Sequence, residues 1–475
     1  MIFNRERLQR RLARRIGLWA CCAIGASWLG LAGSALAVDK PSADPFYSYD
    51  PGAIAGVPPG AVLRSRAISV PTLGVLPGSA VPGTQALYRT QNQLGQPTAT
   101  VATIIPPPAS GPPPPTKLLS YQTFYDGLDD SCRPSYTLQG GVPATGSGNA
   151  DNNLLLGYVR DGYTVVSPDY EGPADDYTAG RESGYGTLDG IRAAQSTLGL
   201  PATAPVGLVG YSGGSIASDW ASELSPSYAP QLNIIGVAEG GIPVDYAHMF
   251  AYINGSTAWA GVIPALTLGL VRAYRLDLAQ YFNATGQQIL AQVAKGCLTA
   301  GAYPGLHFED LLKPEYRNWQ QVPELVQIFN DAIMGGVGTP KEPLFMAVGN
   351  ADGTGDGVMP AGDVTALAHT YCGRGVPVQF HLYNGSDHVA SLTRFDSDAR
   401  QFMQQRYAGT TAANECASIG PGNPLTPLPI PPGPVQPSTG STPSPAAKHR
   451  KCRKQRHKAR KGKCRKHRRI GPARS

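Results

Sequence analysis

Residues 205–218, PVGLVGYSGGSIAS, place Ser212 between glycines, with an apolar run before it and small residues after it. The segment 210–214 fits the pattern Gly-x-Ser-x-Gly, although in a chain with 57 glycines such a match can arise by chance around an ordinary turn serine. The flanking residues favour chemistry, because VGLVG suits a buried strand and SIASDWASEL suits a helix. A strand that delivers a serine to the start of a helix directs N-terminal amides at a forming oxyanion. The stretch therefore predicts a nucleophile elbow with Ser212 at its tip.

The same alternation of strand and helix continues on both sides of the elbow. Apolar runs that suit buried strands occur at 117–122, 163–168, 206–212, 233–240, 343–350 and 377–383. Stretches with helical spacing lie between them at 152–161, 187–198, 216–223 and 364–372. Strands buried on both faces and separated by helices predict an α/β fold with a mostly parallel central sheet and helices on both faces.

Two segments depart from this alternation. Residues 38–115 are interrupted by prolines, so we expect them to wrap or link rather than build central sheet, apart from one strand at 98–105. Residues 242–338 contain no convincing strand and read as helical. Because ligand sites in open α/β sheets lie at the carboxyl ends of the strands, we expect an inserted helical cap or lid there. The alternative is a helical packing element with no role in access.

The ends of the chain differ from its body. Six arginines precede an uncharged stretch that ends Ala35-Leu36-Ala37, which predicts a signal peptide over 1–37, with a retained membrane anchor as the alternative. Residues 38–419 form the expected hydrolase domain. Residues 420–447 read as an extended linker too rich in proline to pack. Residues 448–475 hold fifteen Lys or Arg and no acid, so the body is acidic although the whole chain carries +7.

The basic tail suggests a partner rather than a reaction. Its charges fit electrostatic contact with an anionic cell wall or membrane surface, which would retain a secreted protein at the wall. A solvated extension without function is the competing interpretation. No aromatic residue is interleaved with the charges, so no specific nucleic-acid recognition is expected. An envelope-bound adhesion protein with an inactive hydrolase body is a further alternative. We expect a monomer.

A serine nucleophile needs a histidine base held by a carboxylate. Of the five histidines between 38 and 419, His388 follows the last predicted strand, where a side chain reaches the top of the sheet. The acid should lie in the loop after the preceding strand, AVGNADGTGDGVMP, where Asp352 and Asp356 compete and Asp363 starts the next helix. The order Ser, Asp, His is that of α/β-hydrolases.

Four cysteines lie in the body: Cys132, Cys297, Cys372 and Cys416. An even number in an exported chain predicts two disulfides, with three possible pairings. No spacing typical of zinc ligands accompanies them, and we expect no metal and no cofactor.

Several sequence blocks together carry a family resemblance: LLSYQTFYD…CRPSY, VVSPDYEGP, GYSGG, DGVMP and GSDH. Over about residues 98–416 the chain resembles the secretory lipases of fungi and actinobacteria. The resemblance implies Asp356 as the catalytic acid, because it precedes Pro360 at a helix start. It also implies an oxyanion hole made by the backbone N–H groups of Asp126 and Gly213. The insertion NADGTGD departs from the family and keeps Asp352 as an alternative acid.

The resemblance also implies the disulfide pairs Cys132–Cys297 and Cys372–Cys416. Separately, the apolar stretch AWAGVIPALTLGLV of the predicted cap suits a lid over an acyl-binding tunnel, which favours long-chain acylglycerols as substrates. The expected function is a secreted serine hydrolase of carboxylic esters, a triacylglycerol lipase acting at an oil–water interface through an acyl-enzyme. A short-chain carboxylesterase with the same triad and a static cap is the alternative.

Overall fold

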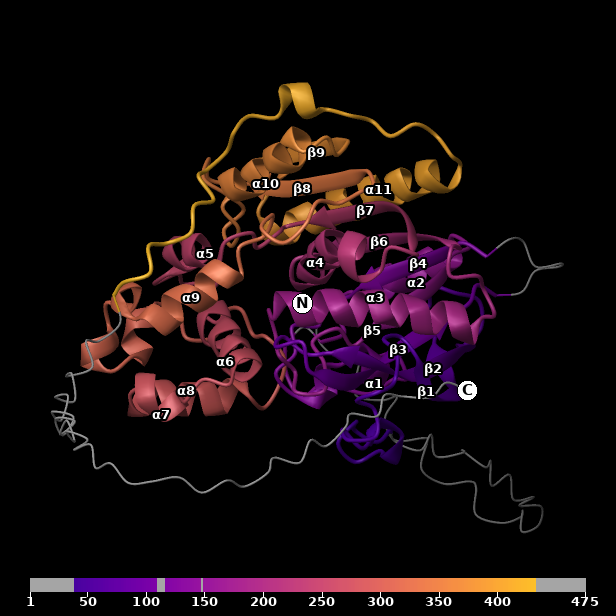
Figure 1. The fold of residues 1–475 in the computed structure, drawn as a ribbon, viewed down its shortest axis with the longest axis horizontal. Helices are drawn as coiled ribbons and strands as arrows, with labels where there is room; N and C mark the ends of the chain where they lie inside the picture. Colours follow the sequence, from indigo (N-terminus) through magenta and orange to yellow (C-terminus); the bar gives the residue numbers. More distant parts are fainter. Residues whose placement is uncertain (1–37, 109–115, 147, 433–475) are drawn as a thin grey trace, which may run out of the picture.

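The computed structural model describes residues 38–108, 116–146 and 148–432. The predicted signal peptide and basic tail lie outside these residues. A nine-stranded sheet with the order β1-β2-β3-β5-β4-β6-β7-β8-β9 forms the centre (Figure 1). Its last six positions, from β5 to β9, are parallel. They comprise β4 (Leu118–Gln122), β5 (Thr164–Pro168), β6 (Pro205–Tyr211), β7 (Asn233–Gly240), β8 (Leu344–Asn350) and β9 (Val378–Asn384).

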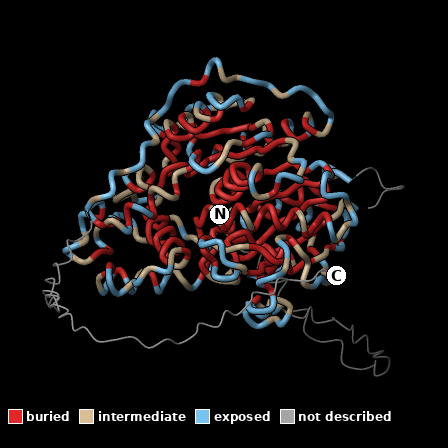
Figure 2. The backbone as a smooth tube through the Cα atoms, in the orientation of Figure 1, coloured by how far each residue is buried: buried red, intermediate tan, exposed pale blue. Residues whose placement is uncertain are grey.

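Helices cover both faces of the sheet, as predicted. On β8, Leu344 and Met346 face one hydrophobic cluster and Phe345 faces the other, which is the alternation expected of a strand buried on both sides. The first cluster takes side chains from α3 (Gly180–Thr197), α4 (Gly213–Tyr228) and α10 (Ala361–Gly373). The second takes them from α2 (Asn152–Arg160) and α11 (His388–Tyr407). Figure 2 shows the buried chain concentrated along these strands and helices.

The prediction for residues 38–115 is wrong in one respect, because this region builds three strands of the central sheet. They are β1 (Val62–Pro71), β2 (Ala80–Gln91) and β3 (Pro97–Ile105), paired antiparallel and joined to β5 through β3. Pro82 is tolerated in β2 because β3 pairs only with residues 84–91 of that strand. Pro82 lies opposite Ser69 of β1 and outside the part of β2 that pairs with β3. Its missing N–H therefore costs no hydrogen bond between β2 and β3.

The region 242–338 is helical, as expected. Figure 1 shows its helices gathered beside the sheet, away from β1 and β2. Its interior is aromatic: Phe250 packs against Phe308 and Phe329, and Trp319 against Phe329. We call this region the cap; it contains α5 (Tyr246–Ile253), α6 (Val262–Tyr274), α7 (Leu278–Tyr281), α8 (Ala284–Val293), α9 (Pro323–Asp331) and the short 3-10 turns Phe308–Leu311, Pro314–Tyr316 and Trp319–Gln321.

The expectation that residues from 420 onward do not pack is wrong for 420–432. This segment runs from the end of the body across α10 to α9 (Figure 1). Asn423 N–H donates to Gly362 O (2.9 Å), and Asn330 of α9 exchanges two hydrogen bonds with the backbone of Leu428. Prolines prevent helix and sheet but leave the other amides free to bond to the body.

Two disulfides cross-link the domain in the pairs that the family resemblance implies. Cys132–Cys297 joins the loop after β4 to the cap, and Cys372–Cys416 joins the end of α10 to the segment after α11. Among the described helices, none combines the length and apolar character needed to cross a membrane.

Candidate active site

Ser212 sits at the tip of a tight turn between β6 and α4. Its backbone is in a strained conformation (φ 53°, ψ −124°), as a nucleophile elbow requires. The flanking glycines make the turn possible: a Cβ on Gly210 would lie 2.2 Å from Gly214 O, and one on Gly214 would lie 2.1 Å from Gln122 O. The local sequence therefore fixes both the position and the exposure of the serine hydroxyl.

His388 is within hydrogen-bond distance of that hydroxyl, with Nε2 2.9 Å from Ser212 Oγ. Sequence analysis placed it in a loop, whereas it is the first residue of α11, behind the N-cap Asp387. The Tyr211 hydroxyl donates to His388 O (2.6 Å), and the Tyr211 ring lies 5.1 Å from the imidazole. On the cap side, the Trp259 ring meets the imidazole edge-on at 5.4 Å. The base is therefore held between a core tyrosine and a cap tryptophan.

The structure brings Asp356, and not Asp352, to the histidine. Asp356 is fully buried, and its Oδ2 lies 2.6 Å from His388 Nδ1. Its Oδ1 accepts from the N–H groups of Val358 (2.9 Å) and Met359 (2.7 Å). The His388 N–H also donates to Asp356 O (2.8 Å). These four hydrogen bonds hold the Asp356 carboxylate in place against the His388 imidazole.

Asp352 has a different environment. It is exposed, and its Oδ1 accepts from the N–H groups of Thr354 (2.7 Å) and Gly355 (2.9 Å). Its Oδ2 accepts from the hydroxyl of Tyr252 in α5 (2.8 Å). These donors hold the pKa of Asp352 below its usual range, so the side chain is a charged hydrogen-bond acceptor within its own loop.

The two predicted oxyanion donors lie side by side. Asp126 has a left-handed backbone (φ 43°), and a Cβ on Gly213 would lie 1.9 Å from Asp126 Oδ1. Neither the Asp126 nor the Gly213 N–H donates to a protein acceptor within the described part of the chain. The cap supports this turn, because Leu298 N–H donates to Asp126 O (2.9 Å). Two free amides beside a serine hydroxyl suit stabilisation of a tetrahedral oxyanion.

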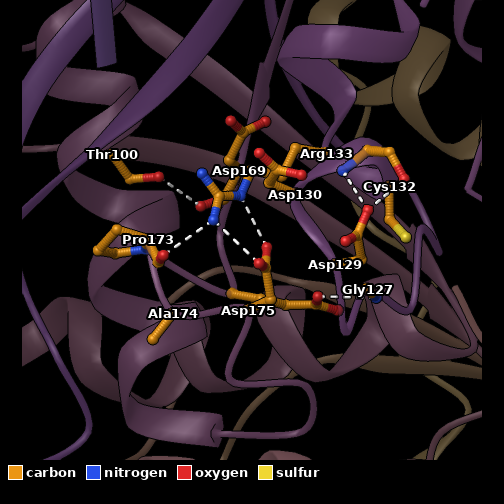
Figure 3. A network of polar contacts seen from close by, with 12 residues as sticks. Thr100, Gly127, Asp129, Asp130, Cys132, Arg133, Asp169, Pro173, Ala174 and Asp175 are labelled. Atoms are coloured by element: carbon orange, nitrogen blue, oxygen red, sulfur yellow. Dashed lines mark hydrogen bonds and ion pairs between the residues drawn. The ribbon is translucent and has the colours of Figure 1, made fainter. Parts of the chain in front are cut away.

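A buried ion pair anchors the loop that follows Asp126. Arg133 donates from Nε and Nη2 to the two carboxylate oxygens of Asp175 (2.7 and 2.9 Å) and from Nη2 to Pro173 O (Figure 3). Gly127 N–H donates to Glu171 Oε2 (2.9 Å). Burial, with Asp151 nearby, raises the pKa of the Asp126 carboxyl well above its usual range, which favours the uncharged form of this side chain beside the oxyanion site.

The space beside Ser212 is narrow and apolar. The cavity measures about 20 Å³ and receives Met249, Trp259, Val262 and Leu266 from the cap. That volume is enough for about one water molecule. Any ligand larger than a water molecule therefore requires these cap side chains to move.

The other four histidines serve elsewhere. His248 Nδ1 lies 3.1 Å from Asp363 Oδ1, His369 Nδ1 lies 3.2 Å from Ile419 O, and His381 Nδ1 lies 2.8 Å from Asp398 Oδ2. His307 is the N-cap of the 3-10 turn at 308–311. In the ranges that the structure describes, no group of three or more His, Cys, Asp or Glu is arranged to hold a metal ion.

Sequence analysis missed three residues around the triad: Tyr211, Tyr252 and Trp259. Tyr211 occupies a variable position of the Gly-x-Ser-x-Gly pattern, so the pattern itself does not single it out. Its place directly before Ser212 was the one signal that could have indicated a role. Nothing local marks Tyr252 or Trp259, because their contacts depend on how the cap docks.

Known proteins show which family this chain resembles. A model of the secretory lipase family matches residues 140–415. The chain belongs to this family. A Candida albicans protein named Lipase 10 is 32% identical over 404 residues, covering 81% of this chain and 84% of that protein. A Mycobacterium tuberculosis protein named "Probable inactive lipase" is 35% identical over 402 residues, covering 82% and 88%.

Solved structures confirm the α/β-hydrolase fold of this chain. Candida antarctica lipase A matches with a TM-score of 0.70 and 29% identity, covering 83% of this chain and 92% of that one. Family and fold together make the protein a hydrolase of the lipase type. One relative is named as inactive. In this chain Asp356, His388 and Ser212 form a continuous hydrogen-bonded series.

Proposed function

We propose that the protein is a secreted serine lipase that cleaves carboxylic esters, with triacylglycerols as its main substrates. The observation that carries the proposal is the series Asp356 Oδ2–His388 Nδ1 (2.6 Å) and His388 Nε2–Ser212 Oγ (2.9 Å) next to two free amides. An inactive binding protein would have no use for this alignment, so the geometry favours an enzyme over an adhesion protein with an inert body.

The proposed reaction is acyl transfer through a covalent intermediate. His388 removes the proton of Ser212 as Oγ attacks the ester carbonyl, and the N–H groups of Gly213 and Asp126 stabilise the oxyanion. His388 then gives its proton to the leaving alcohol, and the acyl-enzyme forms. Water, deprotonated by His388, then attacks the acyl carbon, the bond to Ser212 Oγ breaks as His388 returns the proton to Oγ, and the carboxylic acid leaves. Asp356 orients the imidazole throughout and stabilises its charged form.

Exchange of the serine tests this assignment. Ser212→Ala should lower kcat on a soluble ester by about 10³-fold or more, because an unactivated water would have to replace the nucleophile. Ser225→Ala, on the same helix α4 and bonded only to Ser222 O, is the matched control and should keep parental activity. Equal turnover in Ser212→Ala and the parent protein would refute the proposed function.

The closed apolar pocket supports long-chain acylglycerols as substrates. Opening of the cap at a lipid surface would expose Met249, Trp259 and Leu266 to an acyl chain. The expected signature is a rise in rate when a long-chain ester exceeds its aggregation limit. A rate that depends only on dissolved ester would favour the short-chain carboxylesterase with a static cap.

Family membership and two disulfides support an extracellular site of action. Within the proposal, residues 448–475 hold the monomeric enzyme at anionic wall polymers or lipid surfaces. Cell fractionation of the full chain and of a chain ending at Ala447 tests this, since removal of the tail should release more enzyme into the medium. Equal release would remove wall retention from the proposal and leave the catalytic assignment intact.

A further inference from the structure

A single cap side chain contacts both ends of the loop that carries Asp356. The hydroxyl of Tyr252, on α5, donates to Asp352 Oδ2 (2.8 Å) and accepts from the N–H of Gly357 (3.1 Å). Asp352 precedes Asp356 by four residues and Gly357 follows it directly. The phenol therefore spans the turn at whose centre the acid lies.

The contact with Asp352 reaches an ordered part of this loop. The other oxygen of Asp352 accepts from Thr354 N–H and Gly355 N–H, and Ala351 N–H donates to Gly355 O (2.7 Å). Because a charged acceptor strengthens its hydrogen bonds, Asp352 both closes its own turn and holds the phenol. Its carboxylate thus acts on loop geometry rather than on His388.

The contact with Gly357 lies next to the amides that aim the acid. Asp356 Oδ1 is held by the N–H groups of Val358 and Met359, the two residues after Gly357. Gly357 has a left-handed backbone (φ 98°), so the chain reverses at this residue. A hydrogen bond that fixes the Gly357 peptide therefore limits the movement of the two donors, and with them the carboxylate.

We propose that Tyr252 and Asp352 are positioning residues for catalysis, forming a bridge from the cap that holds the Asp356 loop against His388. This inference rests on the proposed function, since it concerns the acid of that triad. It gives the cap a second role besides covering the site. The oxyanion side is attached to the cap by Cys132–Cys297 and by Leu298, and the acid side by this bridge.

A double-mutant cycle tests the bridge. Tyr252→Phe removes the hydroxyl, and Asp352→Asn keeps an oxygen for Thr354 and Gly355 while replacing the oxygen that accepts from Tyr252. On a soluble short-chain ester, each variant should lower kcat about tenfold with KM within about twofold of the parent, because misplaced catalytic groups slow chemistry more than binding. The double variant should match the single variants, since both changes break one bridge.

Tyr274→Phe is the matched control. Tyr274 is also a cap tyrosine, and its hydroxyl donates to Asp331 Oδ2 (2.7 Å) and accepts from Gln93 Nε2, far from the triad in the hydrogen-bond network. Tyr274→Phe should lower the melting temperature about as much as Tyr252→Phe does, but it should keep kcat within about twofold of the parent. Unchanged kcat in Tyr252→Phe, losses that multiply in the double variant, or an equal loss of kcat in Tyr274→Phe would each overturn the bridge.

Ser212→Ala, measured in the same assay, separates the two proposals. Full turnover in Ser212→Ala refutes the triad whatever Tyr252 does. Loss of turnover there, combined with unchanged kcat in Tyr252→Phe, refutes the bridge alone.

Discussion

Asp352 and Asp356 stand four residues apart in one loop, yet their surroundings give them different chemistry. Asp356 is buried with one oxygen against His388 Nδ1, where in the proposed reaction it would stabilise the imidazolium. Asp352 is exposed and bonds to loop amides and a cap phenol. The residue pattern of the loop left the two equivalent until the family resemblance favoured Asp356, because burial depends on how the loop folds back on the sheet.

Exchange of each aspartate by asparagine distinguishes them at the residue scale. Asp356→Asn should lower kcat about 10³- to 10⁴-fold, because the amide favours the wrong tautomer of His388. Asp352→Asn should cost only about tenfold, through loop position. Steady-state kinetics on a soluble ester measures both. A larger loss in Asp352→Asn than in Asp356→Asn would return Asp352 to the role of acid.

At the scale of elements, the two disulfides should have different consequences. Replacing both Cys132 and Cys297 by serine cuts the cap from the oxyanion turn, and replacing Cys372 and Cys416 cuts α10 from the chain after α11. Each pair should lower the free energy of unfolding by about 2–5 kcal/mol. Only the first pair should also lower kcat, since its bond lies next to Asp126. Denaturant unfolding and kinetics report the two effects, and equal losses of kcat would contradict the account.

Elements with a continuous apolar run could be predicted from sequence, and elements stabilised by partners could not. The six strands β4–β9 are short buried runs bounded by turns, so their pattern is sufficient. β1 is the first strand in the sheet order, and it carries the exposed residues Arg64 and Ser65. These polar residues weaken the apolar pattern that would indicate a buried strand. In β2, Pro82 and Gly83 lie within the strand and argue against it locally. The prediction that residues 420–432 do not pack was wrong for the same reason. Hydrogen bonds to Asn330 and Gly362, which lie elsewhere in the sequence, hold this segment against the domain.

The candidate site divides in the same way. Ser212 and His388 carry local signals, namely an elbow and a position after the last strand. Asp356 became distinct from Asp352 through family resemblance and then through burial. Tyr252 and Trp259 enter the site from the cap, about a hundred residues before the acid in the chain, and no periodicity of α5 indicates that contact.

At the scale of the whole molecule, many carboxyl groups are buried. Burial raises the pKa of Asp151, Asp169 and Glu342 to about 7 and that of Asp176 to about 6. Burial and neighbouring carboxyl groups raise the pKa of Glu239 well above its ordinary value, and neither of its oxygens has a partner among the described residues. Each group therefore keeps its proton to a higher pH in the folded protein than in the unfolded chain.

Stability should therefore fall as the pH rises. A raised folded pKa contributes stability that is complete below the unfolded pKa, about 4, and is lost as the pH passes through the folded pKa of about 6–7. Thermal unfolding should occur at a lower temperature at pH 8 than at pH 5. Glu239→Gln, which cannot ionise, should reduce this difference. A melting temperature that rises from pH 5 to pH 8, or an unchanged difference in Glu239→Gln, would contradict the assignment.

Covalent labelling tests directly whether Ser212 is an activated nucleophile. An alkyl fluorophosphonate reacts with a serine that has a working base and oxyanion hole, and intact mass followed by peptide mapping locates the adduct. One adduct per chain is expected, on Ser212, with labelling slowed about 10³-fold or more in His388→Ala. No adduct in the folded parent protein, or an adduct on another residue, would contradict it.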